Sequence, residues 1–147
     1  FTLALRLCGD REAAQDVLQD TMLKLIDRLQ DFRGDSPFWG WLRQIAVNEA
    51  LMRLRKRRID YVEELPELAD LEASVPVAAS RPELERALGQ LPELTRSVVW
   101  LYYVEGYTHE EIASAFGRTP SFSKSQLSRG TARLRAQLAA PEVAAYA

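Results

Sequence analysis

Apolar residues recur with a helical period through the first third of the chain. Between positions 11 and 30 they form a stripe with a spacing of about 3.6 residues, and no glycine or proline interrupts it, so one long helix is predicted. The residues of this stripe are Val17, Leu18, Met22, Leu25, Ile26 and Leu29. The chain opens on Phe1-Thr2-Leu3 within an apolar helical pattern and without a Met, so we expect a first helix that is cut short at its start.

A second long helix is predicted after a turn at residues 31–36. Ser36 followed by Pro37 fits an N-cap with proline at the first helical position, and the apolar spacing continues to about Arg57. The apolar positions include Phe38, Trp41, Leu42, Ile45, Ala46 and Leu54. Four residues fall partly or wholly outside the stripe: Trp39, Arg43, Asn48 and Arg53. Five cations lie within residues 53–58, where the helix dipole needs only one or two, so this end is suited to phosphate groups.

The apolar pattern weakens over residues 59–81 and returns in the second half of the chain. Prolines, small residues and acidic residues in that stretch predict a linker. The next helix starts near Pro82, with Ser80 or Arg81 at its cap, and Leu91-Pro92 marks a break before a helix over residues 93–105. Gly106 suits the left-handed conformation that ends such a helix.

The last two predicted helices form a hairpin around a tight turn. Thr108 with Glu111 is a capping box, and Gly117 ends the short helix that it opens. Thr119-Pro120 opens a basic helix, with Leu127, Leu134 and Leu138 inward and Lys124, Arg129, Arg133 and Arg135 mostly outward. Gly130 is expected to lower the stability of this helix by about 1 kcal/mol relative to alanine. Such a hairpin is either a helix-turn-helix that places its second helix in a DNA groove or ordinary helical packing.

These elements predict an all-α protein of two small helical domains, because no strand of convincing length is present. The first domain covers residues 1–58, the linker 59–81, the second domain 82–140 and a tail 141–147. With 147 residues and a hydrophobic content of 47%, the chain can form a packed core in each domain.

The net charge of −2 hides a strong segregation of charge along the chain. Residues 32–58 carry seven basic and two acidic side chains, and residues 118–140 carry five basic and no acidic ones. The linker carries one basic and six acidic residues, which makes it a poor ligand for nucleic acid. The two basic patches indicate either two modules that contact one polyanion at two places or two solvated helix faces.

The sequence offers no constellation of residues for catalysis, metal binding or a cofactor. No nucleophile with its base, metal-ligand cluster or phosphate-binding glycine loop has the required spacing. The lone Cys8 and the lone His109 are expected to be a partly buried free thiol and an exposed imidazole. No apolar run approaches the roughly 18 residues of a membrane span, and no signal-peptide pattern opens the chain. We therefore expect a cytoplasmic protein that is not an enzyme and needs no cofactor.

Aromatic and acidic residues mark two further candidate surfaces. Four rings lie beside the basic helix: Phe32, Phe38, Trp39 and Trp41. A ring can stack on an unpaired base for roughly 1–3 kcal/mol, but core packing is the competing explanation, so only an exposed ring would indicate function. On the first long helix, Asp16 and Asp20 lie one turn apart and repel each other, which indicates either a site for a basic partner or an ordinary solvated surface.

Four segments resemble one family in the same order along the chain. They are residues 14–21 (AQDVLQDT), 32–48 (FRGDSPFWGWLRQIAVN), 91–92 (LP) and 103–113 (YVEGYTHEEIA). They are similar to the bacterial RNA polymerase sigma factors of the sigma-70 family, and in particular to the small extracytoplasmic-function (ECF) group, which has only regions 2 and 4. The likeness covers nearly the whole chain and includes a linker between the two modules.

The resemblance implies a transcription initiation factor that binds core RNA polymerase and directs it to promoters. Region 2 would dock on the clamp helices of the polymerase β′ subunit through Asp16, Gln19 and Asp20. Region 2 would also melt the minus-ten element and capture a flipped base, for which unstacking costs a few kcal/mol. The residues implied for this DNA contact are Phe32, Arg33, Ser36, Trp39, Arg43, Asn48, Arg55, Lys56, Arg57 and Arg58.

Region 4 would bind the major groove at the minus-thirty-five element and also meet the polymerase β flap. The resemblance implies contacts to base edges from Ser121, Ser123, Lys124 and Gln126. It implies phosphate contacts from Arg118, Arg129 and Arg133. Ser121-Phe122-Ser123 replaces the family's usual turn sequence before the recognition helix, so we expect promoter specificity to differ there. An anti-sigma factor is a further implied partner.

Two other functions stay open at this point. A free-standing helix-turn-helix regulator would bind duplex DNA without polymerase, although it leaves residues 12–58 unexplained. A sigma-like interaction module would sequester polymerase or an anti-sigma factor without initiating transcription. Ala13 and Gln15, which stand where family members often carry acids, favour this second alternative, and phosphorylation of Thr21 would then restore negative charge.

Overall fold

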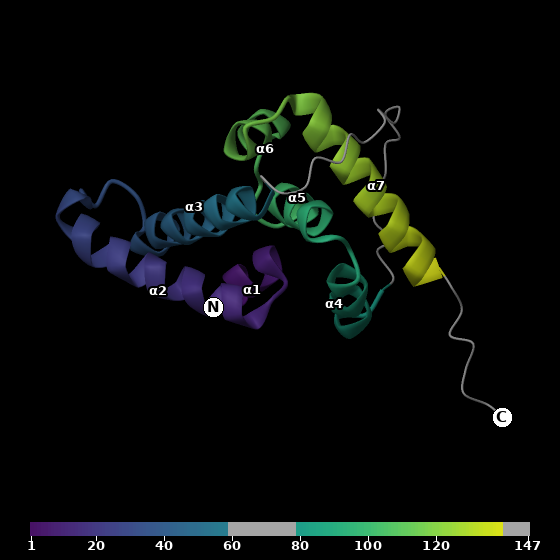
Figure 1. Ribbon diagram of the computed structural model, residues 1–147, viewed down its shortest axis with the longest axis horizontal. Coiled ribbons are helices and arrows are strands. Elements are labelled where there is room, and N and C mark those ends of the chain that lie inside the picture. Colours follow the sequence, from purple (N-terminus) through teal and green to yellow (C-terminus); the bar gives the residue numbers. More distant parts are fainter. Residues whose placement is uncertain (59–78, 140–147) are drawn as a thin grey trace. The chain divides into compact units, whose positions relative to one another are not determined.

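The computed structural model describes residues 1–58 and 79–139 and, within the first range, side chains up to Lys56. Every regular element in these two ranges is helical, so the predicted all-α class is confirmed (Figure 1). The chain divides into two compact units, Phe1–Glu64 and Leu65–Ala147. Most of the predicted linker and the tail at residues 141–147 lie outside the described residues, so the predicted domain boundaries stay predictions.

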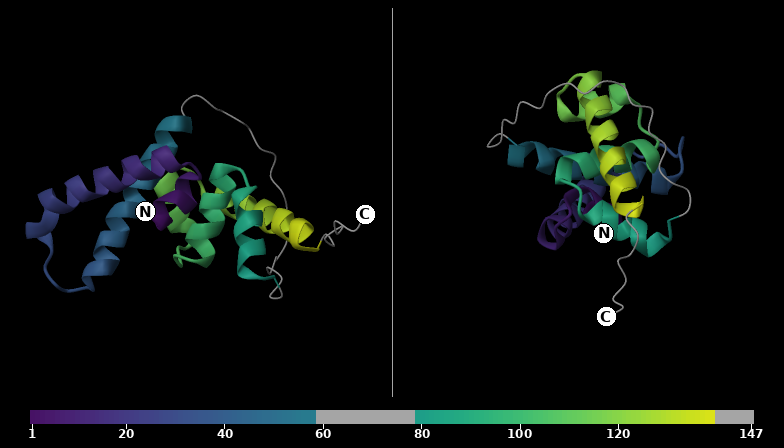
Figure 2. Two further views of the ribbon diagram at one scale, coloured as in Figure 1. Left: turned by 90° about the horizontal axis from the view of Figure 1, so that it is seen from below. Right: turned by 90° about the vertical axis from the view of Figure 1, so that its right-hand side faces the viewer.

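The first unit is a small bundle of helices. In chain order these are α1 (Thr2–Cys8), α2 (Arg11–Arg28), a short 3-10 helix (Leu29–Asp31) and α3 (Phe38–Arg58). Figure 1 shows α2 and α3 side by side, the left view of Figure 2 shows them separating toward the loop that joins them after the 3-10 helix, and α1 packs against both. Asp10 caps α2 by accepting a hydrogen bond from the Ala13 N–H at 3.0 Å. Both long helices therefore form where the apolar spacing predicts them.

The core of the first unit is built from alanines and aliphatic side chains of all three α helices. Its buried apolar residues are Ala4, Leu7, Cys8, Ala13, Ala14, Val17, Ile45, Val47, Ala50, Leu51 and Leu54. Cys8 is a buried free thiol, in keeping with the expectation for this residue. The inward face of α2 follows Ala13, Ala14, Val17 and Thr21, because the alanines allow close approach of the neighbouring helices.

The predicted apolar stripe of α2 is only partly buried. Val17 is buried and Leu18 and Leu25 are half-buried, whereas Met22, Ile26 and Leu29 are exposed. The pattern predicted the helix correctly, but nothing in the described part of the unit covers this end of the stripe.

The described part of the second unit contains four helices. They are α4 (Arg81–Gly89), α5 (Glu93–Tyr103), α6 (His109–Phe116) and α7 (Pro120–Ala139). Ser80, the first of the two predicted caps, begins α4, and both its N–H and its Oγ–H donate to Glu83 Oε2, at 2.8 and 2.6 Å. Thr108 begins α6: Glu111 N–H donates to Thr108 Oγ1 at 3.1 Å, and Thr108 N–H donates to Glu111 Oε2 at 2.8 Å. The predicted capping box is confirmed.

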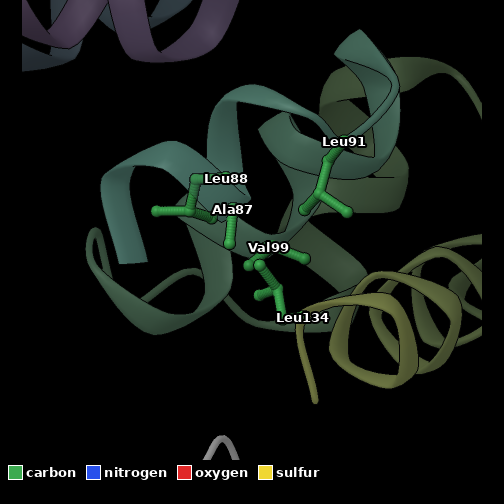
Figure 3. Close-up of a cluster of buried hydrophobic side chains, with 5 residues drawn as sticks. All are labelled: Ala87, Leu88, Leu91, Val99 and Leu134. Carbon is green, nitrogen blue, oxygen red and sulfur yellow. The ribbon is translucent and has the colours of Figure 1, made fainter. Parts of the chain in front are cut away.

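A cluster of buried aliphatic side chains holds α4, α5 and α7 together. It consists of Ala87, Leu88, Leu91, Val99 and Leu134, which Figure 3 shows converging between these helices. Leu127 and Leu138 pack against this cluster from α7, so the leucines predicted to point inward do so.

Gly130 allows α7 to approach α5 closely, which corrects the expectation that alanine would be better at this position. A Cβ atom added at Gly130 would lie 2.5 Å from Val99 Cγ2 and 2.9 Å from Thr95 Cγ2. We expect this clash to outweigh the better helix propensity of alanine.

Helix boundaries otherwise differ from the predictions by one or two residues, as is common at frayed ends. α3 begins at Phe38 rather than Pro37, whose carbonyl oxygen accepts from the Trp41 N–H at 3.2 Å, and α5 ends at Tyr103 rather than residue 105. Within the two described ranges, no helix is long and apolar enough to cross a membrane.

Candidate nucleic-acid and protein interfaces

Helices α6 and α7, with the tight turn between them, form the candidate DNA-binding hairpin of the second unit. Gly117 has a φ of 63°, and the N–H of Arg118 donates to the Ala113 carbonyl oxygen at 2.8 Å. The Arg118 guanidinium lies over the Phe122 ring, 5.6 Å from its centroid, and this ring packs against Phe116. The turn therefore consists of residues 117–119. Ser121-Phe122-Ser123 lies in the first turn of α7, so the prediction that these residues form the turn is wrong.

The inner side of α7 is tied to the rest of its unit by polar contacts. Ser123 Oγ lies 3.0 Å from His109 Nδ1, and the His109 ring stacks on Tyr102 with centroids 4.7 Å apart. Thr95 Oγ1 donates to Gln126 Oε1 at 2.8 Å within the core. The expected exposed imidazole is thus a half-buried one that links α5, α6 and α7.

These contacts correct two predicted base contacts. Ser123 and Gln126 are buried, with 0% and 2% of their surface exposed. Their polar atoms bond to His109 and Thr95, so neither side chain is available to a base edge in this arrangement. The spacing of the apolar residues along α7 could have shown this, because positions 123, 126, 127, 130 and 134 share one face of a helix.

The outer side of α7 carries hydroxyls along its middle and cations at its margins. Ser121, Ser125 and Ser128 follow one line along the helix at spacings of four and three residues. Lys124 lies on one margin of this line, and Arg129 and Arg133 lie on the other. Ser121, Lys124 and Arg133 are exposed, and the other three are partly exposed. The sequence-based list missed Ser125 and Ser128, which the helical spacing from Ser121 would have found.

Three aromatic rings pack together where the loop before α3 meets that helix, and a fourth ring, on α3 itself, is exposed. Phe32 packs against Phe38 and Trp41 at centroid distances of 5.5 and 5.1 Å, and all three are half-buried. Trp39 touches Phe38 edge-on at 5.7 Å yet is 75% exposed. Core packing therefore explains three of the rings, and Trp39 is the one of the four that remains available to stack on a base.

The predicted minus-ten residues of α3 lie along two lines on the helix. Trp39 and Arg43, four residues apart, share one line near the start of α3, and Arg33 and Ser36 are exposed in the loop that precedes this helix. Asn48 and Arg55 belong to a second exposed line, which also contains Gln44 and Met52. Gln44 Nε2 donates to Asn48 Oδ1 at 3.5 Å. Lys56 is exposed between the lines.

The side chains of Arg57 and Arg58 lie outside the described ones, so their predicted phosphate contacts stay predictions.

The acidic residues of α2 have a basic partner within the chain. Arg53 of α3 donates to Asp16 Oδ2 through Nη2 and to Asp20 Oδ2 through Nη1, the latter at 3.3 Å. This ion pair explains how the helix tolerates two acids one turn apart. Gln19, the third residue predicted to bind polymerase, is exposed on the same side of α2.

Large apolar side chains extend this side of α2. Met22, Leu23 and Ile26 are exposed by 42%, 62% and 71%, and helical spacing places Leu23 and Ile26 beside Gln19. We call the surface formed by Gln19, Met22, Leu23 and Ile26 the apolar face of α2. Contiguous exposed apolar side chains of this kind are typical of protein–protein contacts.

Thr21 is buried, and its Oγ1 donates to the Val17 carbonyl oxygen at 2.6 Å. The suggested phosphorylation of Thr21 is therefore at odds with the structure, because the hydroxyl is shielded.

Comparison with protein families agrees with this division into two helical modules. Residues 1–59 match the family model Sigma-70 region 2, and residues 81–134 match the model Sigma-70, region 4. The chain therefore belongs to the sigma-70 family of RNA polymerase sigma factors, within its ECF group.

Individual relatives support this assignment. The chain is 33% identical to the ECF RNA polymerase sigma factor SigE of Mycolicibacterium smegmatis over 150 residues, which cover 95% of this chain and 57% of that protein. It is 36% identical to the RNA polymerase sigma-H factor of Pseudomonas aeruginosa over 76% of this chain and 66% of that protein. It is 33% identical to the RNA polymerase sigma-E factor of Streptomyces coelicolor over 98% of this chain and 82% of that protein. The chain thus spans less than two thirds of the first two of these relatives.

A solved structure shares the fold. The chain matches the sigma factor RpoE of Bartonella quintana, crystallised in complex with the anti-sigma factor NepR, with a TM-score of 0.57 and 24% sequence identity. The match covers 95% of this chain and 89% of that one.

Proposed function

We propose that the chain is a transcription initiation factor that binds core RNA polymerase and directs it to promoters. The observation that carries this proposal is the presence of region 2 and region 4, in that order, on one chain. Each region contacts a different promoter element in the proposal, and neither contact requires a reaction catalysed by this chain or a cofactor. Its place of action is the cytoplasm, where the polymerase and the promoter are found.

In region 4, the outer side of α7 enters the major groove at the minus-thirty-five element. Ser121, Ser125 and Ser128 are placed to offer hydroxyls to base edges, because they follow the middle of the exposed side. The cations Arg118, Lys124, Arg129 and Arg133 flank this line and hold phosphates. Ser123 and Gln126 are left out of the contact because they are buried.

In region 2, the exposed ring of Trp39 stacks on an unpaired base of the opened minus-ten element. Arg43, one turn further along α3, and the exposed loop residues Arg33 and Ser36 hold the adjoining backbone, which combines the ring and the cations that single-strand binding needs. Asn48 and Arg55 on the second line of α3, with Lys56 beside them, bind the same strand further along.

The apolar face of α2 docks on core polymerase. Removing an exposed aliphatic side chain from water contributes roughly 1.5–3 kcal/mol, and Leu23 and Ile26 are both more than half exposed. Asp16 and Asp20 border this face and offer partial negative charge to a basic partner. Ala13 is buried, so an acid at that position would not extend the exposed surface.

Transcription in vitro with purified core polymerase on a pooled promoter library tests the proposal. We expect promoter-dependent transcripts only when the full chain and core polymerase are both present. Lys124→Ala should weaken use of the minus-thirty-five element roughly tenfold, since a good base or phosphate contact contributes about 1–3 kcal/mol. Asn48→Ala should impair open-complex formation without loss of promoter binding.

Arg86→Ala is the matched control, because Arg86 is an exposed cation of the same unit that lies on α4. If transcription were unchanged by both Lys124→Ala and Asn48→Ala, the residue assignments would be wrong. Polymerase binding without transcription from any promoter would favour the sequestering module, and tight operator binding without polymerase would favour the free-standing regulator.

An anti-sigma factor is a second proposed partner, because the solved structure with this fold contains one bound to RpoE. Competition for the apolar face of α2 would block polymerase binding.

A further inference from the structure

The proposed function does not explain the ion pair that Arg53 makes with α2. The guanidinium reaches Asp16 and Asp20 at the same time, because its planar fork presents two N–H groups in parallel. The side chains of Arg53, Asp16 and Asp20 are 34%, 50% and 49% exposed. A cation of another protein can therefore reach the same carboxylates.

A pocket of about 390 Å³ adjoins this ion pair within the first unit. Five carboxyl groups line it, from Asp10, Glu12, Asp16, Asp20 and Glu49, against the two cations Arg53 and Lys56, and Lys24 forms a further ion pair with Glu49. The excess of negative charge suits the side chain of an arginine or a lysine. Arg53 therefore already occupies the position beside Asp16 and Asp20 that a basic side chain of a partner would take.

We propose that Arg53 is an intramolecular competitor that lowers the affinity of this acidic pocket for basic side chains of core polymerase. The inference rests on the proposed docking of α2 on polymerase. A basic group that enters the pocket either displaces Arg53 from Asp16 and Asp20 or remains beside it and is repelled. Both outcomes weaken docking relative to a chain in which residue 53 is uncharged.

The size of the effect follows from the exposure of the pair. Partly exposed ion pairs contribute little, so polymerase can displace Arg53, and its removal should tighten binding only roughly three- to tenfold. The gain should shrink as salt is raised from about 0.1 M toward 1 M, because the Debye length falls from about 10 to 3 Å.

Equilibrium binding of the labelled full chain to purified core polymerase, without DNA, tests the inference. Arg53→Met retains the length of the aliphatic side chain and removes the charge, so it should bind three- to tenfold more tightly than wild type. Arg53→Lys retains the charge but cannot engage both carboxylates through one fork, so its affinity should lie between the two. Arg28→Met is the matched control: Arg28 is an exposed cation at the end of α2, and its removal should change affinity by less than twofold.

A second experiment separates competition from a change in packing. In an Asp16→Asn/Asp20→Asn background, Arg53→Met should give a smaller gain than in wild type, since only the repulsion by the Arg53 charge remains to be relieved. An equal gain in both backgrounds would show that competition for these two carboxylates is not the cause. Circular dichroism should show the same helical content for every variant, and Arg53→Gln replaces Arg53→Met if the latter does not fold.

Binding that is unchanged or weaker in Arg53→Met, with wild type still binding, overturns the inference and leaves the proposed function standing. Failure of wild type to bind polymerase at any salt concentration refutes the proposed function itself, and the inference with it.

Discussion

The two units of this protein differ in the kinds of side chain that they expose and bury. Among the described residues, the first unit exposes most of the large apolar side chains that face water: Phe1, Met22, Leu23, Ile26, Leu29, Trp39 and Met52. The second unit exposes only Tyr103 and Val104 among its described residues of this kind. It buries instead a set of polar residues: Thr95, Arg96, Ser97, Ser123, Gln126 and Thr131.

This difference indicates what each unit binds. Exposed aliphatic side chains gain from a partner that excludes water, which a protein surface does and a phosphate backbone does not. Buried polar residues position a helix with directional contacts, and they leave the outer side of α7 to serines and cations. The first unit is therefore suited to both a protein and unpaired bases, whereas the second is suited to duplex DNA.

The apolar face of α2 gives the largest expected effect. Leu23→Asp with Ile26→Asp should weaken core-polymerase binding by at least roughly 100-fold, because two aliphatic contacts of about 1.5–3 kcal/mol each are lost. The fold should persist, since both side chains are exposed. Equilibrium binding and circular dichroism measure the two effects.

The matched control for this pair is Thr2→Asp with Gln44→Asp, which adds the same charge at exposed positions of α1 and α3, outside the apolar face of α2. Equal losses in both double variants would mean that charge alone is responsible and that the contrast between the units does not hold.

Gly130→Ala tests the close contact of α5 and α7. The added Cβ would clash with Val99 and Thr95, so we expect destabilisation of about 1–3 kcal/mol despite the better helix propensity of alanine. Urea unfolding of the full chain measures it. Gly89→Ala in α4 is the control, because a Cβ there meets no atom within 4 Å, and stabilisation by Gly130→Ala would contradict the packing.

The buried hydrogen bond between Thr95 and Gln126 should have a smaller effect. Gln126→Leu leaves the Thr95 hydroxyl unpaired and should cost about 1 kcal/mol. Combining it with Thr95→Val removes both partners, so the double variant should be more stable than the sum of the two single changes predicts. Simple additivity in unfolding experiments would show that the two residues are not coupled.

The smallest expected effect concerns the cap of α4. Hydrogen bonds from the Ser80 side chain and backbone lower the pKa of Glu83 from its ordinary value of 4.5. Ionised Glu83 therefore adds stability above pH 4.5, and this stability is lost as the pH falls through the lowered pKa of the folded state. In an NMR titration, Ser80→Ala should move the pKa of Glu83 back up, whereas an identical titration curve would exclude the hydrogen bond as the cause.

Much of the architecture follows from sequence patterns that act over short distances. Apolar spacing predicted the helices, and the capping residues Ser80 and Thr108, together with Gly117, predicted where helices begin and end. These features depend on backbone hydrogen bonds and dihedral preferences within a few residues, so no knowledge of the tertiary fold is needed. The four segments that resemble the family are each a contiguous stretch of sequence, so the family could also be inferred without the tertiary structure.

Only the tertiary structure decided which side of each helix is available to a partner. Ser123 and Gln126 are polar, and residue type alone places them on the surface, but His109 and Thr95 approach from other helices and bury them. Leu23 and Ile26 are apolar, yet no neighbouring helix of the described residues covers them. Arg53 lies 33 and 37 residues from the acids that it pairs with. Exposure and pairing of this kind are set by contacts between residues far apart in the chain, and no local pattern specifies those contacts.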